Sequence, residues 1–522
     1  MIREISRRKC LRLWLCKPEY MERTKWENRF VLLRFRKKNY MMFLKDLKRF
    51  KMERLYDKLK AYSESDFYAF HMPGHKRNKA LLGIELPYDL DITEIDGFDD
   101  LHHADGILKE EQERAARVFG AEESHFLVNG STAGILSAVM GCTHRGDKIL
   151  VARHCHKSIY HAIYMNGLVP RYVYPEFDIS MHMNGEISKE DVAKALAAEP
   201  DIKAVVIVSP NYDGVVSDVK GIAEVAHSYR IPLIVDEAHG PHFGFHPVFP
   251  ERANDLGADV VINSLHKTLP SLTQTAILHI NGKIVNRRRI KKYLDMLQSS
   301  SPSYIFMASL DTCVDFVDGK CENAFELYVE RLQKFREELK PLQHLQILRT
   351  EHYDISKVVI STANANITSP ELADRLRKEY HLEMEMTGGT YVLAMTTVAD
   401  TQEGLDRLKA ALLEIDGQLE AKTAVSGSIE ISGELPRLEQ YFTPQEAADR
   451  EEDGEAEEIP WKESEGYISL EYAYLYPPGS PVIVPGERIS REAVELLRYY
   501  ETQNLQIEGI QTEGKIKVWK HE

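Results

Sequence analysis

Residues 233–240 read Leu-Ile-Val-Asp-Glu-Ala-His-Gly, and residues 260–268 read Val-Val-Ile-Asn-Ser-Leu-His-Lys-Thr. Each segment opens with a short apolar, β-branched run and passes directly into polar residues. Such runs are typical of strands that are buried on both faces of a parallel sheet. Because ligands of these sheets bind beyond the carboxyl ends of the strands, the polar residues that follow are the first candidates for a functional site.

The same alternation extends over residues 106–320, which we expect to form one large domain. Apolar runs predict strands at 125–128, 148–152, 204–208, 232–235, 260–262 and 275–280. Amphipathic stretches of helical length separate them, at 132–140, 157–165, 189–198 and 219–228. This pattern predicts an α/β fold with a mostly parallel sheet and helices on both faces.

The remaining chain is too long for the same domain. We expect an arm and linker at 51–105, a connecting helix at 322–340 and a smaller α/β domain within 321–425. In the smaller domain, strands are expected at 357–361, 382–386 and 391–395, and helices at 370–379 and 401–415. Residues 426–522 predict a C-terminal α+β domain with an acidic loop or surface helix at 446–465, an apolar Pro/Gly-rich segment at 468–487 and a helix at 490–501.

Charge and cysteine content restrict the function. The net charge of −15 argues against nucleic acid or an anionic membrane as the main partner. The six cysteines form no C-x-x-C pair, so no metal site is expected, and their scarcity favours a reducing, cytoplasmic location. No apolar run is long enough for a membrane span.

Residues 1–50 are basic, with 16 Lys and Arg against five Asp and Glu. One interpretation is an arm that binds RNA or an acidic partner. The favoured one is a non-conserved extension, translated from an upstream start, for which Met41, Met42 and Met52 are alternative starts.

Lys267 follows the apolar run at 260–262 directly. A lysine that forms a Schiff base must be desolvated, so that its amine is partly neutral well below the free pKa of about 10.4. The end of a strand in a crevice supplies this setting. Ser264 and His266 flank the lysine with donors that suit a phosphate ester. The alternative is a surface lysine that happens to follow a strand.

Asp236 ends the apolar run at 233–235 and lies 31 residues before Lys267. A pyridoxal ring withdraws electrons well only while its ring nitrogen stays protonated, and a buried aspartate keeps it so. The alternative for Asp-Glu-Ala-His is a helicase-like metal motif. That motif requires an upstream G-x-x-x-x-G-K-[ST] segment, which the chain lacks.

Two further segments follow predicted strands. Ser131 and Thr132 lie in the turn 129–134, where backbone N–H groups at the start of a helix and two hydroxyls predict a phosphate site, or simply an N-cap. His156 lies in the segment 152–158, where an imidazole could stack on a cofactor ring. The alternative is an ordinary polar residue whose hydrogen bonds are satisfied.

Along the chain, the four segments occur in the order phosphate turn, ring-stacking histidine, ring-nitrogen aspartate and Schiff-base lysine. In this order they make the chain resemble the ornithine/lysine/arginine decarboxylases, a group III pyridoxal-phosphate family of aspartate-aminotransferase-like fold type I. Supporting motifs lie at 70–76, 99–102, 301–304, 307–311, 476–479 and 485–487, so the resemblance covers most of residues 65–510. It is closer to the short, Gram-positive-type arginine/lysine decarboxylases. The receiver-like domain of longer members is not expected, because the His-Met-Pro-Gly-His motif already begins at His71.

The resemblance implies a role for each candidate. Lys267 would form the Schiff base with pyridoxal 5′-phosphate, Asp236 would pair with the ring nitrogen and His156 would stack on the ring. His239 would lie near the cofactor phenolate or the substrate carboxylate. The phosphate would be held by Ser131, Thr132, Ser264 and His266.

The resemblance also implies the reaction, which is removal of CO₂ from a basic L-amino acid in polyamine metabolism. Arginine is favoured over lysine, and lysine over ornithine. A homodimer or larger homo-oligomer is expected, with residues 301–304 reaching the partner's site. Carboxylates that could bind the distal cation, or could simply be solvated at the surface, are Asp100, Glu383, Glu385 and Glu471.

Three alternatives stay open. An aminotransferase or an aldolase on the same fold would need a 2-oxo acid acceptor or would release an aldehyde. A regulatory homologue would have kept the fold and lost the chemistry, against which the set of Lys267, Asp236 and His156 argues.

Overall fold

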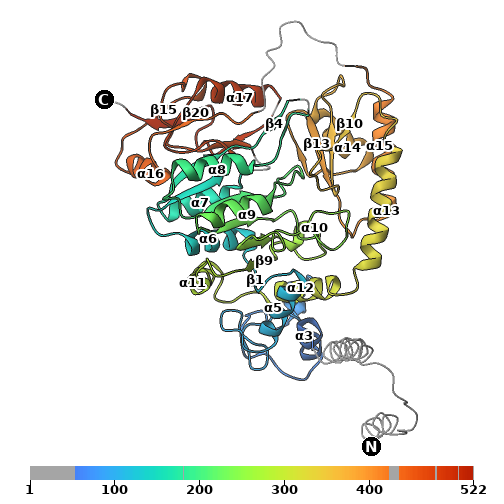
Figure 1. Ribbon diagram of the computed structural model, residues 1–522. Coiled ribbons are helices and arrows are strands. Elements are labelled where there is room, and N and C mark those ends of the chain that lie inside the picture. Colours follow the sequence, from blue (N-terminus) through green and yellow to red (C-terminus); the bar gives the residue numbers. More distant parts are fainter. Residues whose placement is uncertain (1–52, 180, 422–433, 476–478, 504, 521–522) are drawn as a thin grey trace, which may run out of the picture. The chain divides into compact units, whose positions relative to one another are not determined.

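The structure is a computed structural model that describes residues 53–520 except 180, 422–433, 476–478 and 504 (Figure 1). The predicted basic extension at 1–50 lies outside the described residues. Within the described part of the chain, no helix combines the length and the apolar character that crossing a membrane requires.

A seven-stranded sheet forms the centre of the large domain, in the order β1-β9-β8-β7-β6-β2-β3. All neighbouring strands are parallel except β9, which runs antiparallel to both β1 and β8. The mostly parallel sheet is therefore confirmed. Its strands are β1 (Glu123–Leu127), β2 (Lys148–Ala152), β3 (Val169–Val173), β6 (Val205–Val208), β7 (Leu233–Asp236), β8 (Val260–Asn263) and β9 (Ala276–Ile280).

Every residue of β6, β7 and β8 is buried, as expected for central strands covered by helices. Helix α6 packs on β8 and β9, and α9 packs on β7. The helices of this domain are α6 (Gly130–Cys142), α7 (Lys157–Met165), α8 (Lys189–Ala198), α9 (Val219–Ser228), α10 (Leu265–Thr268) and α11 (Arg287–Leu297). A small hairpin joins β4 (Phe177–Asp178) to β5 (Met183–Asn184).

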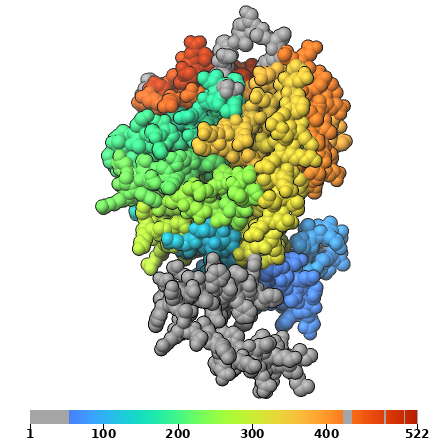
Figure 2. All heavy atoms as spheres, turned by 45° about the vertical axis from the view of Figure 1, so that its right-hand side comes forward, coloured from blue at the N-terminus to red at the C-terminus, as the bar shows by residue number. Residues whose placement is uncertain are grey.

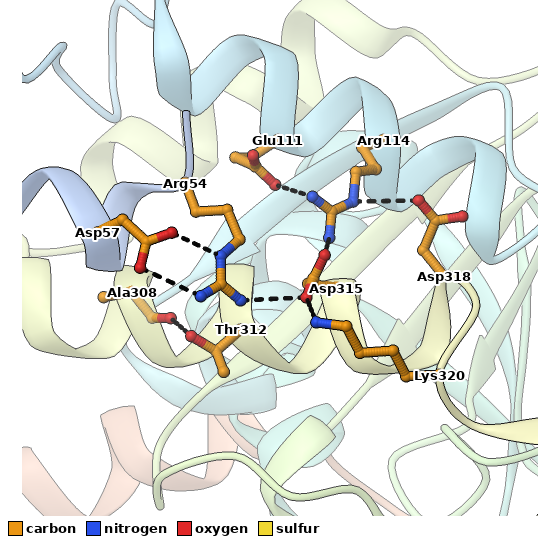
Figure 3. Close-up of polar contacts among 9 residues, drawn as sticks. All are labelled: Arg54, Asp57, Glu111, Arg114, Ala308, Thr312, Asp315, Asp318 and Lys320. Carbon is orange, nitrogen blue, oxygen red and sulfur yellow. Dashed lines mark hydrogen bonds and ion pairs between the residues drawn. The ribbon is translucent and has the colours of Figure 1, made fainter. Parts of the chain in front are cut away.

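Three helices that are far apart in the chain meet at one carboxylate (Figure 3). Asp315 on α12 (Tyr304–Val317) lies 3.1 Å from Arg54 and 3.1 Å from Arg114. Arg54 precedes α3 (Leu55–Ser63), and Arg114 belongs to α5 (Ile107–Val118). Asp315 therefore ties both helices to α12. A short helix, α4 (Lys79–Leu82), lies between α3 and α5 in the chain.

The connecting helix α13 (Glu322–Glu338) leads into the smaller domain, whose surface adjoins that of the large domain (Figure 2). This domain contains an antiparallel sheet in the order β10-β11-β13-β12. Its elements are β10 (Gln346–Leu348), β11 (Lys357–Ser361), α14 (Ser369–Tyr380), β12 (Met386–Thr387), β13 (Tyr391–Met395) and α15 (Gln402–Asp416). The strand predicted at 382–386 was placed too early, because the register with β13 begins only at Met386.

The C-terminal segment is α+β, as predicted. The prediction for the acidic stretch 446–465 was only partly correct. The surface helix α16 (Pro444–Glu452) is followed by a strand, β15 (Ala456–Pro460), which pairs with β20 (Lys515–Trp519). The helix predicted at 490–501 is α17. The elements are β14 (Glu439–Gln440), α16 (Pro444–Glu452), β15 (Ala456–Pro460), η1 (Trp461–Glu463), β16 (Ala473–Leu475), β17 (Pro481–Ile483), β18 (Glu487–Arg488), α17 (Arg491–Thr502), β19 (Ile507–Glu508) and β20 (Lys515–Trp519).

Candidate active site

The predicted site residues follow the carboxyl ends of three parallel strands. Asp236 is the last residue of β7 and pairs in register with Ile262 of β8. Lys267 lies in α10, directly after β8, and His156 follows β2. Because these strands run in the same direction, the three side chains gather at one edge of the sheet. The charge of Lys267 acts on both Asp236 and His156.

The amine of Lys267 is in contact with His239. Its Nζ lies 2.8 Å from Nε2 of His239 and 6.0 Å from the centre of the Tyr212 ring. Burial lowers the pKa of Lys267, while Asp236 and Glu385 oppose that shift. Removal from water disfavours the charged ammonium, so this lysine meets the requirement for an amine nucleophile.

Asp236 is buried, and its Oδ1 accepts a hydrogen bond of 3.2 Å from the Ala238 amide. Burial raises the pKa of this carboxyl, and Lys267 lowers it. A cationic partner stabilises the ionised form of a buried carboxylate. The ring nitrogen of a pyridinium is a partner of this kind, so Asp236 fits the role that the sequence predicts.

His156 is the N-cap of α7. Its Nδ1 accepts a hydrogen bond of 3.2 Å from the Ser158 amide, which fixes the orientation of the ring. Burial, followed by the charge of Lys267, lowers the pKa of His156 to about 4. The imidazole is therefore neutral at physiological pH, as suits a group that stacks on an aromatic ring.

The residues predicted to hold a phosphate lie in two places. Ser131 and Thr132 begin helix α6, and Ser264 is the N-cap of α10. The Ser264 hydroxyl is fully buried and has no hydrogen-bond partner among the described residues. Such a group is costly unless a ligand satisfies it, so a phosphate ester fits here. His266 Nδ1 lies 2.9 Å from the Thr275 carbonyl oxygen.

Sequence reasoning missed two residues of the site, Lys357 and Tyr212. Nζ of Lys357, on β11 of the smaller domain, lies 3.0 Å from Nδ1 of His239. The Tyr212 ring centre is 4.5 Å from that of His239, and the Tyr212 hydroxyl donates a hydrogen bond to Glu385. For Lys357, the only local signal was its place directly before the apolar run 358–360.

Of the four carboxylates considered for a distal cation, Glu385 is the one that lies at this site. Asp100 is hydrogen-bonded to His103, and Glu471 accepts the backbone amide of Lys517 at 2.9 Å. Glu383 is exposed and faces Arg377. Residues 476–478, part of a supporting motif, lie outside the described residues.

Comparisons with known proteins identify the family. The family model described as "Orn/Lys/Arg decarboxylase, major domain" matches residues 53–421, and the one described as "Orn/Lys/Arg decarboxylase, C-terminal domain" matches residues 433–514. The arginine decarboxylase of Bacillus subtilis is 33% identical over 471 residues, which cover 87% of this chain and 95% of the relative. That of Bacillus anthracis is 32% identical over 487 residues, which cover 89% and 97%.

A solved structure supports the fold. The constitutive lysine decarboxylase of Escherichia coli superimposes with a TM-score of 0.76 at 21% identity, covering 96% of this chain and 86% of that one. Identity this low shows the fold alone. Because the two family models cover nearly all of the described residues, the resemblance inferred from sequence is confirmed, and the chain belongs to the Orn/Lys/Arg decarboxylase family.

Proposed function

We propose that this protein is a pyridoxal-phosphate-dependent decarboxylase of a basic L-amino acid, with arginine as the favoured substrate and agmatine as the product. The observation that carries the proposal is the partly buried Lys267 amine, which lies 2.8 Å from His239 and whose charge Asp236 stabilises. The names of the Bacillus relatives support arginine over lysine and ornithine.

When bound, pyridoxal phosphate supplies an electron sink for the bond that breaks as CO₂ leaves. In this proposal Lys267 holds the cofactor covalently, Asp236 keeps its ring nitrogen protonated and His156 packs on the ring. The phosphate is held by Ser131, Thr132, Ser264 and His266. The orphaned hydroxyl of Ser264 supports that assignment.

The protein's own residues contribute orientation and proton transfer. Decarboxylation replaces the α-carboxylate by a proton, so one proton must reach Cα for each CO₂ released. Lys267 Nζ and His239 Nε2 form a hydrogen-bonded pair that can hold such a proton at the buried edge of the sheet. His239 and Asp236 are buried, so they would limit the access of water to a cofactor and substrate held between them.

Release of CO₂ tests the proposal. The full-length chain, loaded with pyridoxal phosphate, should release labelled CO₂ from arginine faster than from lysine or ornithine. Borohydride reduction followed by peptide mapping should place the cofactor on Lys267, and Lys267→Ala should lose the label and the activity. Label at another lysine, or undiminished CO₂ release by Lys267→Ala, would overturn the assignment. Dependence on a 2-oxo acid, or release of an aldehyde, would favour an aminotransferase or an aldolase.

The proposal includes a homodimer or larger homo-oligomer, with residues 301–304 near the partner's site, in the cytoplasm and in polyamine metabolism. The free cysteines Cys142, Cys155, Cys313 and Cys321 are compatible with a reducing compartment. Light scattering tests the assembly, and a monomeric mass at assay concentrations would refute it.

A further inference from the structure

His242 joins three segments that meet at the candidate site. It lies on the loop after β7, six residues after Asp236. Its Nδ1 lies 2.9 Å from the hydroxyl oxygen of Thr268, the neighbour of Lys267 in α10. Its Nε2 lies 3.1 Å from Oδ1 of Asp354, which precedes β11 of the smaller domain. His242 therefore connects the loop that carries Asp236 to the helix that carries Lys267 and to the smaller domain.

The three members of this chain of contacts are all buried. The side chains of His242 and Asp354 are 2% and 0% exposed, and Thr268 is buried as well. The rings of Phe243 and Phe249 meet the imidazole edge-on, with ring centres 4.9 and 4.7 Å away. Close packing of this kind leaves the imidazole little freedom to turn away from its two partners. A buried polar group without a partner is costly, so each of these contacts contributes to holding the others.

Asp354 gives the chain of contacts a fixed end. Its backbone amide donates to the carbonyl oxygen of Gly214, on the loop after β6, at 2.8 Å. Its carboxylate accepts the Ser356 amide at 3.0 Å and the Ser356 hydroxyl at 2.7 Å. Because these bonds hold Asp354 without His242, the carboxylate is a fixed point to which His242 can be held.

The donors and acceptors fix the direction of the first contact. Burial raises the pKa of Asp354, but the charge and hydrogen bond of His242, together with Lys357 and Ser356, lower it overall. Asp354 is therefore ionised, and an ionised carboxylate can only accept hydrogen bonds. Nε2 of His242 must be the donor to Asp354.

The other ring nitrogen of His242 is then the acceptor. In the part of the chain that the structure describes, the Thr268 hydroxyl has no partner besides Nδ1 of His242. If Nδ1 also carried a proton, the hydroxyl hydrogen of Thr268 would be buried without an acceptor. The neutral Nε2–H tautomer gives every group a partner, so Thr268 donates to His242 and His242 donates to Asp354.

Helix α10 depends on contacts of this kind. It consists of only four residues, Leu265–Thr268. Isolated helices shorter than about 12 residues are marginal in water, so tertiary contacts decide whether one turn keeps its shape. The hydrogen bond of His266 goes to the Thr275 carbonyl oxygen within the same segment. Thr268, in contrast, is held from outside the segment by His242.

We propose that His242 is a positioning residue, which accepts a hydrogen bond from Thr268 and donates one to Asp354, and by which the smaller domain holds the turn that carries Lys267. The inference deepens the proposed function, on which it rests for the role of Lys267. Loss of the Thr268 hydroxyl and loss of the Asp354 carboxylate should therefore loosen the same turn.

Hydrogen exchange measures this turn without cofactor or substrate. The full-length chain is freed of cofactor with hydroxylamine and diluted into D₂O, and the peptides that cover residues 262–270 are followed by mass spectrometry. Thr268→Val, which removes the hydroxyl and keeps the shape, should raise their exchange rate about tenfold, as expected for the loss of one buried hydrogen bond. Asp354→Ala should also raise it, although this substitution lies in the smaller domain. Unchanged exchange in Thr268→Val would overturn the proposal.

Two variants control for general destabilisation. Thr143→Val removes another buried threonine hydroxyl, which donates to the Val139 carbonyl oxygen at the end of α6. Asp400→Ala removes a carboxylate that accepts the Thr397 amide elsewhere in the smaller domain. Neither should change the exchange of residues 262–270. If both controls accelerate it as much as Thr268→Val does, the turn reports only overall stability and His242 has no positioning role.

A double-mutant cycle tests whether the effect passes through His242. His242→Gln removes the Nδ1 acceptor and supplies an amide that can still donate to Asp354. In this background Thr268→Val should change the exchange of residues 262–270 much less than it does in the wild-type chain. An equal change in both backgrounds would mean that Thr268 acts without His242 and would refute the proposal.

Steady-state kinetics of the loaded enzyme separate positioning from binding. A displaced Lys267 affects the reaction more than substrate binding, so Thr268→Val should lower kcat about tenfold and change the KM for arginine little. Thr268→Ser, which keeps the hydroxyl, should restore most of kcat. A higher KM at unchanged kcat would assign Thr268 to substrate binding and would contradict the positioning role.

The exchange measurements do not depend on turnover. If they follow the expected pattern but no CO₂ is released from any basic amino acid, the proposed function fails while the anchoring of the turn by His242 stands. If CO₂ is released and Thr268→Val changes neither exchange nor kcat, the role of His242 fails alone.

Discussion

Arg153 and Glu487 form an ion pair from which solvent is fully excluded. The guanidinium nitrogens Nη1 and Nη2 lie 2.7 and 2.8 Å from the two carboxylate oxygens, and Nη2 also donates to the Val482 carbonyl at 2.9 Å. Arg153 comes directly after β2, three residues before His156. The pair therefore fixes the C-terminal segment to the strand end that leads to the candidate site.

Glu487→Gln should lower the free energy of unfolding by about 3–5 kcal/mol, because the Arg153 cation would remain buried without its counter-ion. Urea denaturation followed by circular dichroism measures the loss. Glu439→Gln, which removes an exposed partner of Arg488, is the control and should cost less than about 1 kcal/mol. Equal losses in the two variants would contradict the role of the buried pair.

Two buried acids, Glu111 and Asp311, predict that the stability of the fold depends on pH. Glu111 and Asp311 are fully buried, and their carboxylate oxygens lack hydrogen-bond donors among the described residues. Burial, followed by the charge of Asp311, raises the pKa of Glu111 to about 9. The charge of Asp315 adds to this rise, and the charge of Arg114 opposes it. The folded protein therefore holds a proton here that the unfolded chain releases near pH 4.3.

Because the folded-state pKa is raised, this proton stabilises the fold fully below about pH 4, and the contribution is lost as the pH rises toward 9. The loss has an upper limit of about 1.4 kcal/mol per pH unit. Glu111→Gln should flatten the dependence of urea midpoints between pH 6 and 8.5, while the exposed Glu113→Gln should not. An unchanged slope in Glu111→Gln would show that Glu111 carries no proton.

Sequence predicted the parts of the fold in which local pattern and burial agree. The central strands β6, β7 and β8 are short apolar runs and are buried throughout. Strand β3 was missed, because Pro170 and Arg171 interrupt its run at the edge of the sheet. Strand β15 was missed for a similar reason, since Glu457 and Glu458 place charge on both faces and only pairing with β20 makes it a strand.

The same distinction applies to the site. Residues that directly follow strands, such as Asp236 and Lys267, could be selected because chain position alone places them at the edge of a parallel sheet. Lys357, Tyr212 and Glu385 reach His239 or its neighbours through packing between domains. No local pattern encodes such contacts, so sequence reasoning did not select Lys357 or Tyr212, and it named Glu385 only as one of four candidate carboxylates.

Asp236→Asn should retain bound cofactor but reduce decarboxylation by about 100-fold or more, because a neutral amide cannot stabilise a protonated ring nitrogen as a carboxylate does. Cofactor absorbance measures retention, and release of CO₂ measures turnover. Asp201→Asn, at an exposed position, is the control. Normal turnover with full cofactor occupancy in Asp236→Asn would show that Asp236 is not a catalytic residue.

Glu385→Gln should raise the KM for arginine about tenfold or more and change kcat little. Glu385 is exposed at the site and accepts a hydrogen bond from Tyr212, so it is placed to meet the cationic end of a substrate. Loss of one hydrogen bond to a charged group costs about 1.5–3 kcal/mol. An interaction that is equally strong before and during the reaction changes KM alone.

Glu383→Gln is the matched control for this prediction, because it removes an exposed carboxylate two residues away that faces Arg377 instead of the site. Steady-state kinetics with arginine and lysine separate the outcomes. A fall in kcat at unchanged KM would assign Glu385 to the environment of Lys267 and Lys357, whose pKa values it raises, rather than to substrate binding. Equal KM values in the two variants, both close to wild type, would mean that a residue outside this edge of the sheet binds the distal cation of the substrate.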